Sequence, residues 1–478
     1  MQNGLKYQVY RKNRKNPADY CIIVKQGLTL VIVSLSLKFF SMDAPVIGFS
    51  KLSKTEKVNW LVDTYFDGNT AAHDTITRYW NQDQKLQELH DGFSENTITN
   101  YYFPFGLAPN FLIDGKLVTI PMAIEESSVV AAASKAAKFW LNRGGFKTKV
   151  RSTVKSGQVH IMYNGLHGEM DAFYAFAKAD LLQSVQSINA SMKKRGGGLL
   201  DLQLINKTDV LAGYYQLHAT FETKDAMGAN FINTTLEQLA NTLREKANEF
   251  QGFSLGMPEV IMSILSNYVP ECVVNVSVSC TINEIGTING VSGEDFARKF
   301  TRAVDIATVE PYRAVTHNKG IMNGIDAVVI ATGNDFRAVE AGVHAYAARD
   351  GQYRSLTRAR VENDVFTFEA DFPLALGTVG GLTSLHPLSK LAMQILENPS
   401  AQDLMKVTAV CGLAQNFAAL HSLVTTGIQA GHMKMHLVNM LEQIGANDDE
   451  KLLLKKAFQD KTPSFSGLRE MLADIRKK

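Results

Sequence analysis

One stretch says most about this chain: Thr316-His-Asn-Lys-Gly-Ile-Met-Asn-Gly-Ile-Asp326, then the apolar run Val328-Val-Ile-Ala-Thr332, then Gly333-Asn-Asp335. We predict that Lys319 lies in a glycine-rich loop, because glycine lets backbone approach a ligand closely. The apolar run predicts a strand, and Asp335 would stand between that strand and a following helix. A cation and an anion placed to meet at one site indicate chemistry, although a surface lysine and a helix N-cap are the simpler alternatives.

The composition is that of an ordinary globular protein. The chain has 478 residues, of which 45% are hydrophobic and 20% are charged, so more than one domain is expected. The net charge of +2 gives no indication of a nucleic-acid partner. The 4 cysteines form no Cys-x-x-Cys pair, which argues against a zinc ribbon and favours a reduced, cytoplasmic protein.

The first 41 residues differ from the rest. Basic residues at Arg11-Lys-Asn-Arg-Lys15 precede an apolar stretch that Lys25 interrupts, and such a segment has features of a signal peptide or anchor. Its unbroken part is too short for a membrane span, which needs about 20 residues. We therefore predict an N-terminal extension outside the fold, with Met42 as the natural start and no membrane association.

Hydrophobic periodicity predicts a mixed α+β protein. Ser53-Lys-Thr-Glu56 has the spacing of a capping box, and residues 127–141 read as a helix that stops at Gly144-Gly145. Farther along, the patterns alternate in the order β-α-β-β-α-β, which is the split-βαβ arrangement. The predicted elements of this part are 158–163, 168–189, 199–205, 211–223, 234–250 and 272–280.

The run Pro311-Tyr-Arg-Ala-Val-Thr-His-Asn-Lys-Gly-Ile-Met-Asn-Gly324 closely resembles a signature of 3-hydroxy-3-methylglutaryl-coenzyme A (HMG-CoA) reductases of class II, the soluble prokaryotic form. The resemblance extends from about Phe49 to the C-terminus, with separated motifs in the same order. It implies four catalytic residues, which are Glu126, Lys319, Asp335 and His432. Ser127 stands where the family has a proline, and Thr99, after Glu95-Asn-Thr-Ile98, stands where it has a glycine.

The resemblance also implies a nicotinamide-cofactor domain. Gly196-Gly-Gly198 and the segment Asp225-Ala-Met-Gly-Ala-Asn230 match its loops, and small residues before a helix leave room for an anion. Relatives that prefer NAD carry an acid at the position of Asn189. In this chain that position is an asparagine, and the cations Lys193, Lys194 and Arg195 follow it. Because cations attract a 2′-phosphate, we predict NADPH over NADH. The predicted cofactor contacts are Asn189, Lys193, Arg195, Gly197, Asp225, Met227, Gly228 and Asn230.

The implied fold is a large helix-rich substrate domain with a small inserted ferredoxin-like cofactor domain. We expect the extension at 1–41, the large domain at 42–155 and 284–436, the small domain at 156–283, and a C-terminal flap at 437–478. By the same resemblance, the residues that hold the acyl or coenzyme A groups are Ser128, Asn267, Arg313, Asn323 and Gln415.

The implied reaction converts HMG-CoA to mevalonate and coenzyme A with two hydrides from NAD(P)H, and the same residues would serve mevalonate breakdown. Relatives build the site between subunits, so a homodimer or an assembly of dimers is expected. No metal is expected, because Met433 replaces the glutamate of a zincin motif between His432 and His436. Two rivals are another acyl-CoA enzyme, needing a nucleophile elbow or reactive Cys-His pair that we predict to be absent, and a non-catalytic coenzyme A-binding protein.

Overall fold

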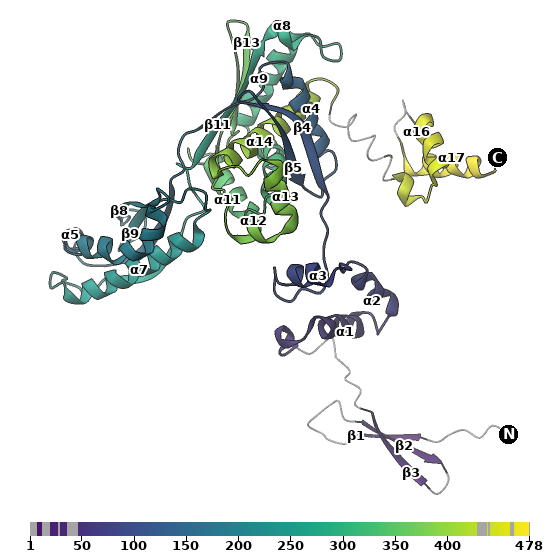
Figure 1. Ribbon diagram of the computed structural model, residues 1–478, viewed down its shortest axis with the longest axis horizontal. Coiled ribbons are helices and arrows are strands. Elements are labelled where there is room, and N and C mark those ends of the chain that lie inside the picture. The colour runs from purple at the N-terminus through teal and green to yellow at the C-terminus, as the bar shows by residue number, and fades with distance from the viewer. Residues whose placement is uncertain are drawn as a thin grey trace. The chain divides into compact units, whose positions relative to one another are not determined.

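The computed structural model describes residues 7–11, 20–26, 29–35, 46–427, 437, 440–458 and 463–477. The chain divides into two compact units, residues 1–102 and residues 103–478. Both contain helices and sheets, so the mixed α and β content predicted above is confirmed (Figure 1).

The first unit combines a three-stranded sheet with short helices. Its elements are β1 (Tyr7–Arg11), β2 (Tyr20–Gln26), β3 (Thr29–Leu35), η1 (Phe49–Lys51), α1 (Lys54–Tyr65), α2 (Thr70–Thr77) and α3 (Gln84–Asp91). The three strands pair antiparallel in chain order, and they were not predicted from the sequence. The predicted capping box is confirmed, because Ser53 accepts from the Glu56 N–H while the Glu56 carboxylate accepts from the Ser53 N–H at 2.8 Å.

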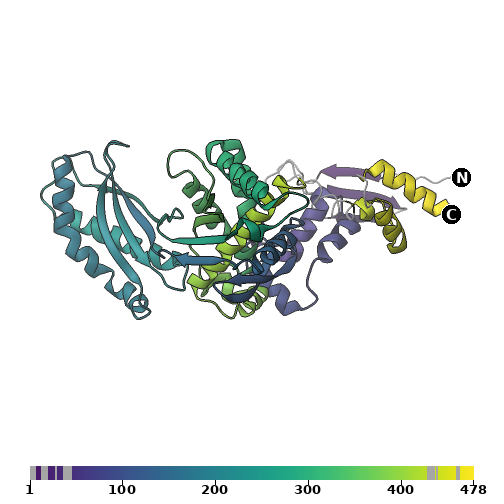
Figure 2. The same ribbon diagram turned by 90° about the horizontal axis from the view of Figure 1, so that it is seen from above.

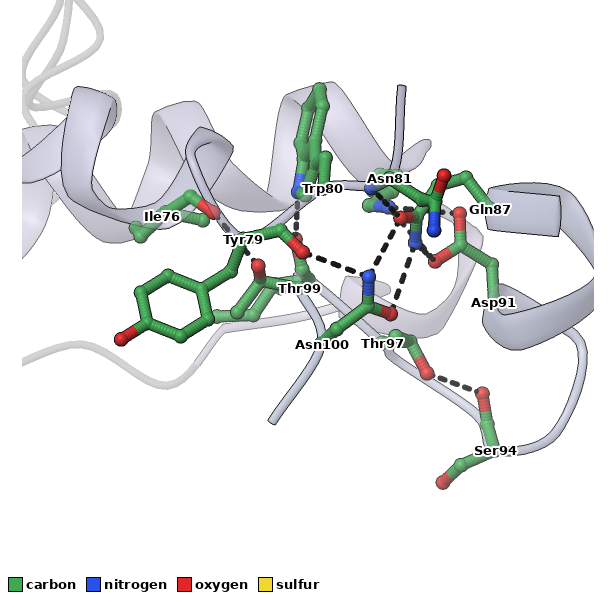
Figure 3. A network of polar contacts seen from close by, with 12 residues as sticks. Ile76, Tyr79, Trp80, Asn81, Gln87, Asp91, Ser94, Thr97, Thr99 and Asn100 are labelled. Atoms are coloured by element: carbon green, nitrogen blue, oxygen red, sulfur yellow. Dashed lines mark hydrogen bonds and ion pairs between the residues drawn. The ribbon is translucent and has the colours of Figure 1, made fainter. Parts of the chain in front are cut away.

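A polar network holds the segment after α3 against the preceding helices (Figure 3). The Trp80 indole donates to the Ile98 carbonyl at 2.8 Å, and the Thr99 hydroxyl donates to the Ile76 carbonyl at 2.7 Å. Thr99 has no positive φ, so the turn does not need the glycine that relatives carry here. The departure from the family motif is therefore accommodated, and its side chain adds a hydrogen bond.

The second unit is built around one large hydrophobic core. A separate part, the small sheet of residues 155–265 with its helices, is described below. The elements around the large core are β4 (Phe105–Ile113), β5 (Lys116–Ala123), α4 (Val129–Leu141), β6 (Lys147–Val150), β11 (Val273–Thr281), α8 (Ile282–Ile285), α9 (Gly293–Val309), α10 (Pro311–Ala331), α11 (Phe336–Ala347), β12 (Thr357–Glu362), β13 (Val365–Pro373), α12 (Gly381–Leu385), α13 (Pro387–Ile395) and α14 (Ala401–Val424). The strands form an antiparallel sheet ordered β12-β13-β11-β6 and a β4-β5 hairpin.

Helix α14 lies in the middle of this core (Figure 1). In the described part of the chain, α14 is the one helix that is long and apolar enough to cross a membrane. However, 78% of its most apolar 18-residue stretch is buried inside the protein. Helix α14 is therefore a core element of the protein.

Helix α10 corrects two expectations. Lys319 does not lie in a loop and residues 328–332 are not a strand, because one unbroken helix runs from Pro311 to Ala331. Its glycines serve helix packing: a Cβ on Gly324 would lie 2.5 Å from the Cys411 carbonyl oxygen of α14. An apolar run that is buried on every side has the same composition in a helix and in a strand, so periodicity alone did not separate them.

A second sheet has its own core, with helices packed on one face (Figure 1 and Figure 2). Its elements are β7 (Lys155–Met162), α5 (His167–Ser184), α6 (Gln186–Lys193), β8 (Gly198–Asn206), β9 (Tyr214–Glu222), α7 (Ala229–Glu249) and β10 (Glu259–Leu265). The sheet is antiparallel with the order β10-β7-β9-β8. The predicted final strand, 272–280, is wrong for this sheet, because it forms β11 of the other sheet and β10 takes its place.

The described C-terminal residues include two further helices, α16 (Asp448–Ala457) and α17 (Phe465–Lys477). They share a small hydrophobic cluster that includes Leu441, Leu454 and Leu468. Arg476 of α17 donates to the Glu450 carboxylate of α16 at 2.7 Å, which joins the two helices.

Candidate functional site

Lys319 and Glu126 meet at the surface of the second unit. Lys319 Nζ donates to Glu126 Oε2 at 2.7 Å, although the two residues lie 193 positions apart in the chain. Lys319 projects from the middle of α10, and Glu126 lies in the short segment between β5 and α4. Both side chains remain accessible, with 59% and 40% of their surface exposed, so a ligand can reach the pair.

The buried side of α10 fixes the direction in which Lys319 points. Asn318 accepts from the Leu356 N–H at 3.1 Å and donates to the Arg354 carbonyl at 2.8 Å. Asn416 of α14 donates to the His317 carbonyl at 3.0 Å. Burial, together with the charge of Arg313, lowers the pKa of His317 to about 3, so this histidine is a neutral structural group at physiological pH.

The backbone before α4 adopts an unusual conformation. Ser128, the residue that precedes the helix, has φ 75° and ψ −14°, which is the left-handed region that non-glycine residues rarely occupy. Its hydroxyl makes no capping bond to the helix. Strained residues of this kind concentrate where a fold positions a functional group, and Ser128 follows Glu126 by two positions. The helix begins at Val129, two residues later than predicted.

Asp335 lies at a different place on the same chain. It is the N-cap of α11, as predicted, and accepts from the N–H groups of Arg337 and Ala338 at 3.0 and 3.1 Å. Its other carboxylate oxygen accepts from the Arg337 guanidinium at 3.0 Å. Among the residues that the structure describes, Asp335 makes no hydrogen bond or ion pair with Lys319 or Glu126.

The length of α10 explains this separation. Lys319 precedes the last residue of the helix, Ala331, by 12 positions, and at about 1.5 Å per residue the helix advances about 18 Å between them. Asp335 follows after a further turn closed by the Gly333 and Asn334 N–H groups. The structure therefore brings Glu126 and Lys319 together within one chain and leaves Asp335 beyond the far end of the helix.

Asp335 instead lines a cavity of about 400 Å³ with residues of α6 and α7 and of the loops that precede β8 and α7. Four of the predicted cofactor contacts share this cavity, and they are Arg195, Met227, Gly228 and Asn230. Gly228 is the N-cap of α7 with φ 96° and no side-chain cap, so the first N–H groups of that helix have no capping side chain. A helix N-terminus of this kind, with Arg195 nearby, is suited to an anionic ligand.

Two other predicted cofactor residues have structural partners instead. Asn189 is 2% exposed, donates to the Val185 carbonyl at 2.9 Å and accepts from the Leu199 N–H at 2.8 Å, so both ends of its amide are occupied. The Asp225 side chain accepts from the N–H of Ala401 at 2.8 Å at the start of α14. Both residues shape the loops around the cavity without lining it.

The remaining cofactor predictions lie close by. Lys193 is exposed at the end of α6, and Gly197 packs so tightly that a Cβ would lie 2.4 Å from the Glu222 carbonyl oxygen. A second glycine-rich segment, Gly377-Thr-Val-Gly-Gly381, also lines the cavity and was not predicted as part of the site. A Cβ on Gly377 would lie 2.4 Å from the Met227 nitrogen, and this cluster of glycines was the signal that could have revealed it.

The predicted substrate residues are dispersed along the second unit. Asn267 is exposed and lines a small cavity beside Met227, while Gln415 is buried in α14 with its side-chain oxygen unpartnered. Arg313 and Asn323 lie half-buried on α10, and partial burial lowers the pKa of Arg313. In the described part of the chain, none of these four makes a hydrogen bond or ion pair with Glu126 or Lys319.

Comparison with known proteins matches this arrangement to one family. The family model for hydroxymethylglutaryl-coenzyme A reductase matches residues 63–437. The chain belongs to the HMG-CoA reductase family. It is 37% identical over 414 residues to the 3-hydroxy-3-methylglutaryl-coenzyme A reductase of Archaeoglobus fulgidus, covering 86% of this chain and 89% of the relative. A probable reductase of Borreliella burgdorferi is 33% identical, covering 77% of this chain and 84% of that protein.

Solved structures of HMG-CoA reductase from Streptococcus pneumoniae resemble this fold. One has a TM-score of 0.67 and 35% identity, covering 90% of this chain and 99% of that one. Another is the class II enzyme bound to NADPH in open conformations, with a TM-score of 0.66 and 36% identity, covering 79% and 99%. The class of enzyme expected from the sequence, an oxidoreductase of this family, is thereby confirmed.

The alternative function, another acyl-CoA enzyme, would need a nucleophile elbow or a reactive Cys-His pair. The sequence does contain one Gly-x-Ser-x-Gly, Gly252-Phe-Ser-Leu-Gly256, which the expectation above overlooked. It follows helix α7 instead of a strand, and the Ser254 hydroxyl donates to Glu169 at 3.1 Å, so it is not a nucleophile elbow. Burial raises the pKa of the three described cysteine thiols, to about 11 for Cys272 and Cys280 and about 12 for Cys411.

Two histidines named from the sequence, His432 and His436, lie outside the described residues. Among the residues that are described, no group of three or more His, Cys, Asp or Glu side chains is arranged to hold a metal ion.

Proposed function

We propose that this chain reduces HMG-CoA to mevalonate and coenzyme A, with NADPH as the hydride donor. The observation that supports the proposal most directly is the accessible Glu126–Lys319 pair at 2.7 Å, in a chain of this family. Reduction of the thioester and then of the aldehyde builds negative charge on the same oxygen, and an ammonium group is suited to stabilise it. Glu126 would supply the proton to that oxygen. Breakdown of mevalonate would use the same residues in reverse.

The simplest test follows the nicotinamide absorbance with HMG-CoA as substrate. The proposal requires HMG-CoA-dependent loss of NADPH, with mevalonate and free coenzyme A thiol as products. A thioesterase would release the thiol without consuming NADPH, and a non-catalytic coenzyme A-binding protein would release neither product.

We propose that the complete site needs two copies of the chain, each supplying a different part. Lys319 lies in the middle of α10 and Asp335 lies beyond its C-terminal end, with about 18 Å of helix between Lys319 and Ala331. In a twofold dimer, the Glu126–Lys319 pair of one copy can face the Asp335 end of the other. The exposed apolar side chains at the start of α10, Tyr312 and Val315, are consistent with a surface that another subunit covers. Asp335 would then hydrogen-bond Lys319 across the interface.

The two parts of the second unit have different proposed roles. We propose that the small sheet with α5, α6 and α7 is the cofactor domain, and that the surrounding unit binds HMG-CoA. Because the reaction consumes reduced nicotinamide, a cytoplasmic location is expected. The described C-terminal helices α16 and α17 would belong to a flap that opens to exchange the spent cofactor between the two reductions.

The residues around the cavity fit a phosphorylated nicotinamide cofactor. The N-terminus of α7 would hold the pyrophosphate, and the exposed Lys193, Lys194 and Arg195 would hold the 2′-phosphate. When bound, the cofactor supplies the hydride for both reductions. The NADPH in the Streptococcus pneumoniae relative supports this choice.

The double change Lys193→Glu with Arg195→Glu should lower kcat/KM for NADPH by about 100-fold or more, because it removes two charged hydrogen bonds that each contribute about 1.5–3 kcal/mol. The value for NADH, which lacks the 2′-phosphate, should change little. The measurement is kcat/KM with each cofactor at saturating HMG-CoA. Arg244→Glu on the far part of α7 is the control for charge reversal in this domain. Equal losses with both cofactors would contradict the assignment.

We propose that His432 protonates the departing coenzyme A thiolate. His432→Gln should then lower reduction of HMG-CoA by about 100-fold or more, the usual contribution of a positioned acid. Reduction of free mevaldehyde releases no thiolate and should be affected far less. The two rates are compared in the same preparation, and equal losses on both substrates would remove His432 from this role.

A further inference from the structure

A pair of carboxyl groups joins α10 to α11 behind the catalytic residues. Asp326 of α10 and Glu340 of α11 form a side-chain hydrogen bond, which two carboxylates can make only if they share a proton. One oxygen of Asp326, Oδ1, is buried and accepts no hydrogen bond from an N–H or hydroxyl group of the described residues. Asp326 is therefore held in a place where a full negative charge is poorly solvated.

The surroundings assign the proton to Asp326. Glu340 accepts from His344 Nε2 at 2.6 Å, and the other ring nitrogen of His344 lies 2.6 Å from the Tyr353 hydroxyl. This hydrogen bond from His344 holds the pKa of Glu340 below its usual range. Burial, then the hydrogen bond and charge of Glu340, then the charge of Glu125 raise the pKa of Asp326 from 3.8 to about 9.

Among the residues that the structure describes, no cation acts directly on Asp326, and His344 contacts Glu340 instead. Glu340 acts on Asp326 from α11 and Glu125 from the segment after β5, and both are acids. Helix α14 packs against another side of α10 with the uncharged residues Cys411, Gln415 and Asn416. The shared proton is therefore what allows Asp326 and Glu340 to remain in contact at neutral pH.

This contact closes the hairpin that carries the two ends of the proposed site. Lys319 and Asp326 are seven positions apart on α10, which places them two turns apart on one face of the helix. Glu340 lies on α11, whose N-cap is Asp335. A bond between Asp326 and Glu340 thus fixes the angle at which α11, and with it Asp335, leaves the end of α10.

We propose that Asp326 and Glu340 are positioning residues for the reductase reaction, a proton-sharing clamp that holds Asp335 in place relative to the helix of Lys319. The proposal rests on the proposed function for its effect on turnover, but the clamp itself can be tested without turnover. Loss of the shared proton at alkaline pH leaves two adjacent carboxylates that repel each other, so the hairpin loosens and Asp335 shifts.

The variant Asp326→Asn separates the clamp from simple packing, because its amide N–H can donate to Glu340 at any pH. In the assembled full-length protein, wild-type kcat/KM should fall at alkaline pH with a midpoint near 9. The midpoint for Asp326→Asn should lie at a proton concentration at least tenfold lower, which is about one pH unit higher. The control is Asp305→Asn, an exposed aspartate of α9 paired with Arg302, which should follow the wild type. An identical alkaline fall in Asp326→Asn and wild type, or a folded but inactive Asp326→Asn at pH 7, would overturn the proposal.

Thermal unfolding as a function of pH tests the clamp even for a protein without turnover. A carboxyl whose pKa is raised in the folded state stabilises that state fully below its unfolded pKa of 3.8, and this contribution is lost as pH rises towards about 9. The difference in Tm between Asp326→Asn and wild type should therefore grow in favour of the variant from pH 5 to pH 9. A difference that does not change with pH would overturn the shared proton, whereas an absence of HMG-CoA reduction would count against the proposed function alone.

Discussion

Lys319→Ala should yield a folded protein that has lost nearly all reduction of HMG-CoA. The ammonium group is the cation of the accessible pair with Glu126, and its removal leaves the developing alkoxide without its main source of stabilisation. Loss of one donor to such an oxyanion typically lowers kcat by about 10²–10³, and a full charge should lie at the upper end of that range.

Folding should be unaffected by this change, because 59% of the Lys319 side chain is exposed and exposed substitutions usually alter stability by less than about 0.5 kcal/mol. The measurement is steady-state NADPH oxidation at saturating HMG-CoA, with Tm recorded for the same preparation. Lys299→Ala, an exposed lysine of the neighbouring helix α9, is the matched control and should keep wild-type turnover. Substantial residual turnover in Lys319→Ala would remove this lysine from the chemistry.

Local signals in the sequence predicted the ends of helices well. Asp335 caps α11 and Ser53 with Glu56 forms a capping box, because these side chains satisfy backbone N–H groups within three residues of themselves. The resemblance to a family singled out Lys319 and Glu126, which the structure places in contact, even though the local structure around Lys319 was predicted wrongly.

The errors arose where the structure depends on distant partners. Residues 311–331 form a helix because α14 packs against them so closely that only glycine fits at position 324. Nothing within the run itself reports that partner, so the glycines read as a loop and the apolar end as a strand. In the same way, 259–265 and 272–280 both have strand-like patterns, and only sheet pairing decides that the first completes the small sheet.

The roles of single side chains were also beyond a sequence argument. Asn189 stands at the position expected to face the cofactor ribose, yet its amide is buried and bonded to Val185 and Leu199. Whether a polar side chain faces a ligand or its own backbone depends on the rotation of α6, which leaves no trace in composition. The same holds for Asp326, whose neighbour Glu340 comes from the next helix.

The two-copy site predicts complementation between inactive variants. Lys319→Ala and Asp335→Asn should each be nearly inactive alone, because each removes one part of every site. When the two chains are co-expressed in equal amounts, about a quarter of the sites should receive Lys319 from one intact source and Asp335 from another. Lys319→Ala mixed with Glu126→Gln is the matched control, because these two residues pair within one chain and no mixed site can regain both.

The most direct measurement is therefore NADPH oxidation by the co-expressed Lys319→Ala and Asp335→Asn chains, purified together and compared with the Lys319→Ala and Glu126→Gln mixture. The account predicts about a quarter of wild-type turnover in the first mixture and almost none in the second. A first mixture as inactive as its separate components would contradict a site that takes its lysine and its aspartate from different copies of the chain.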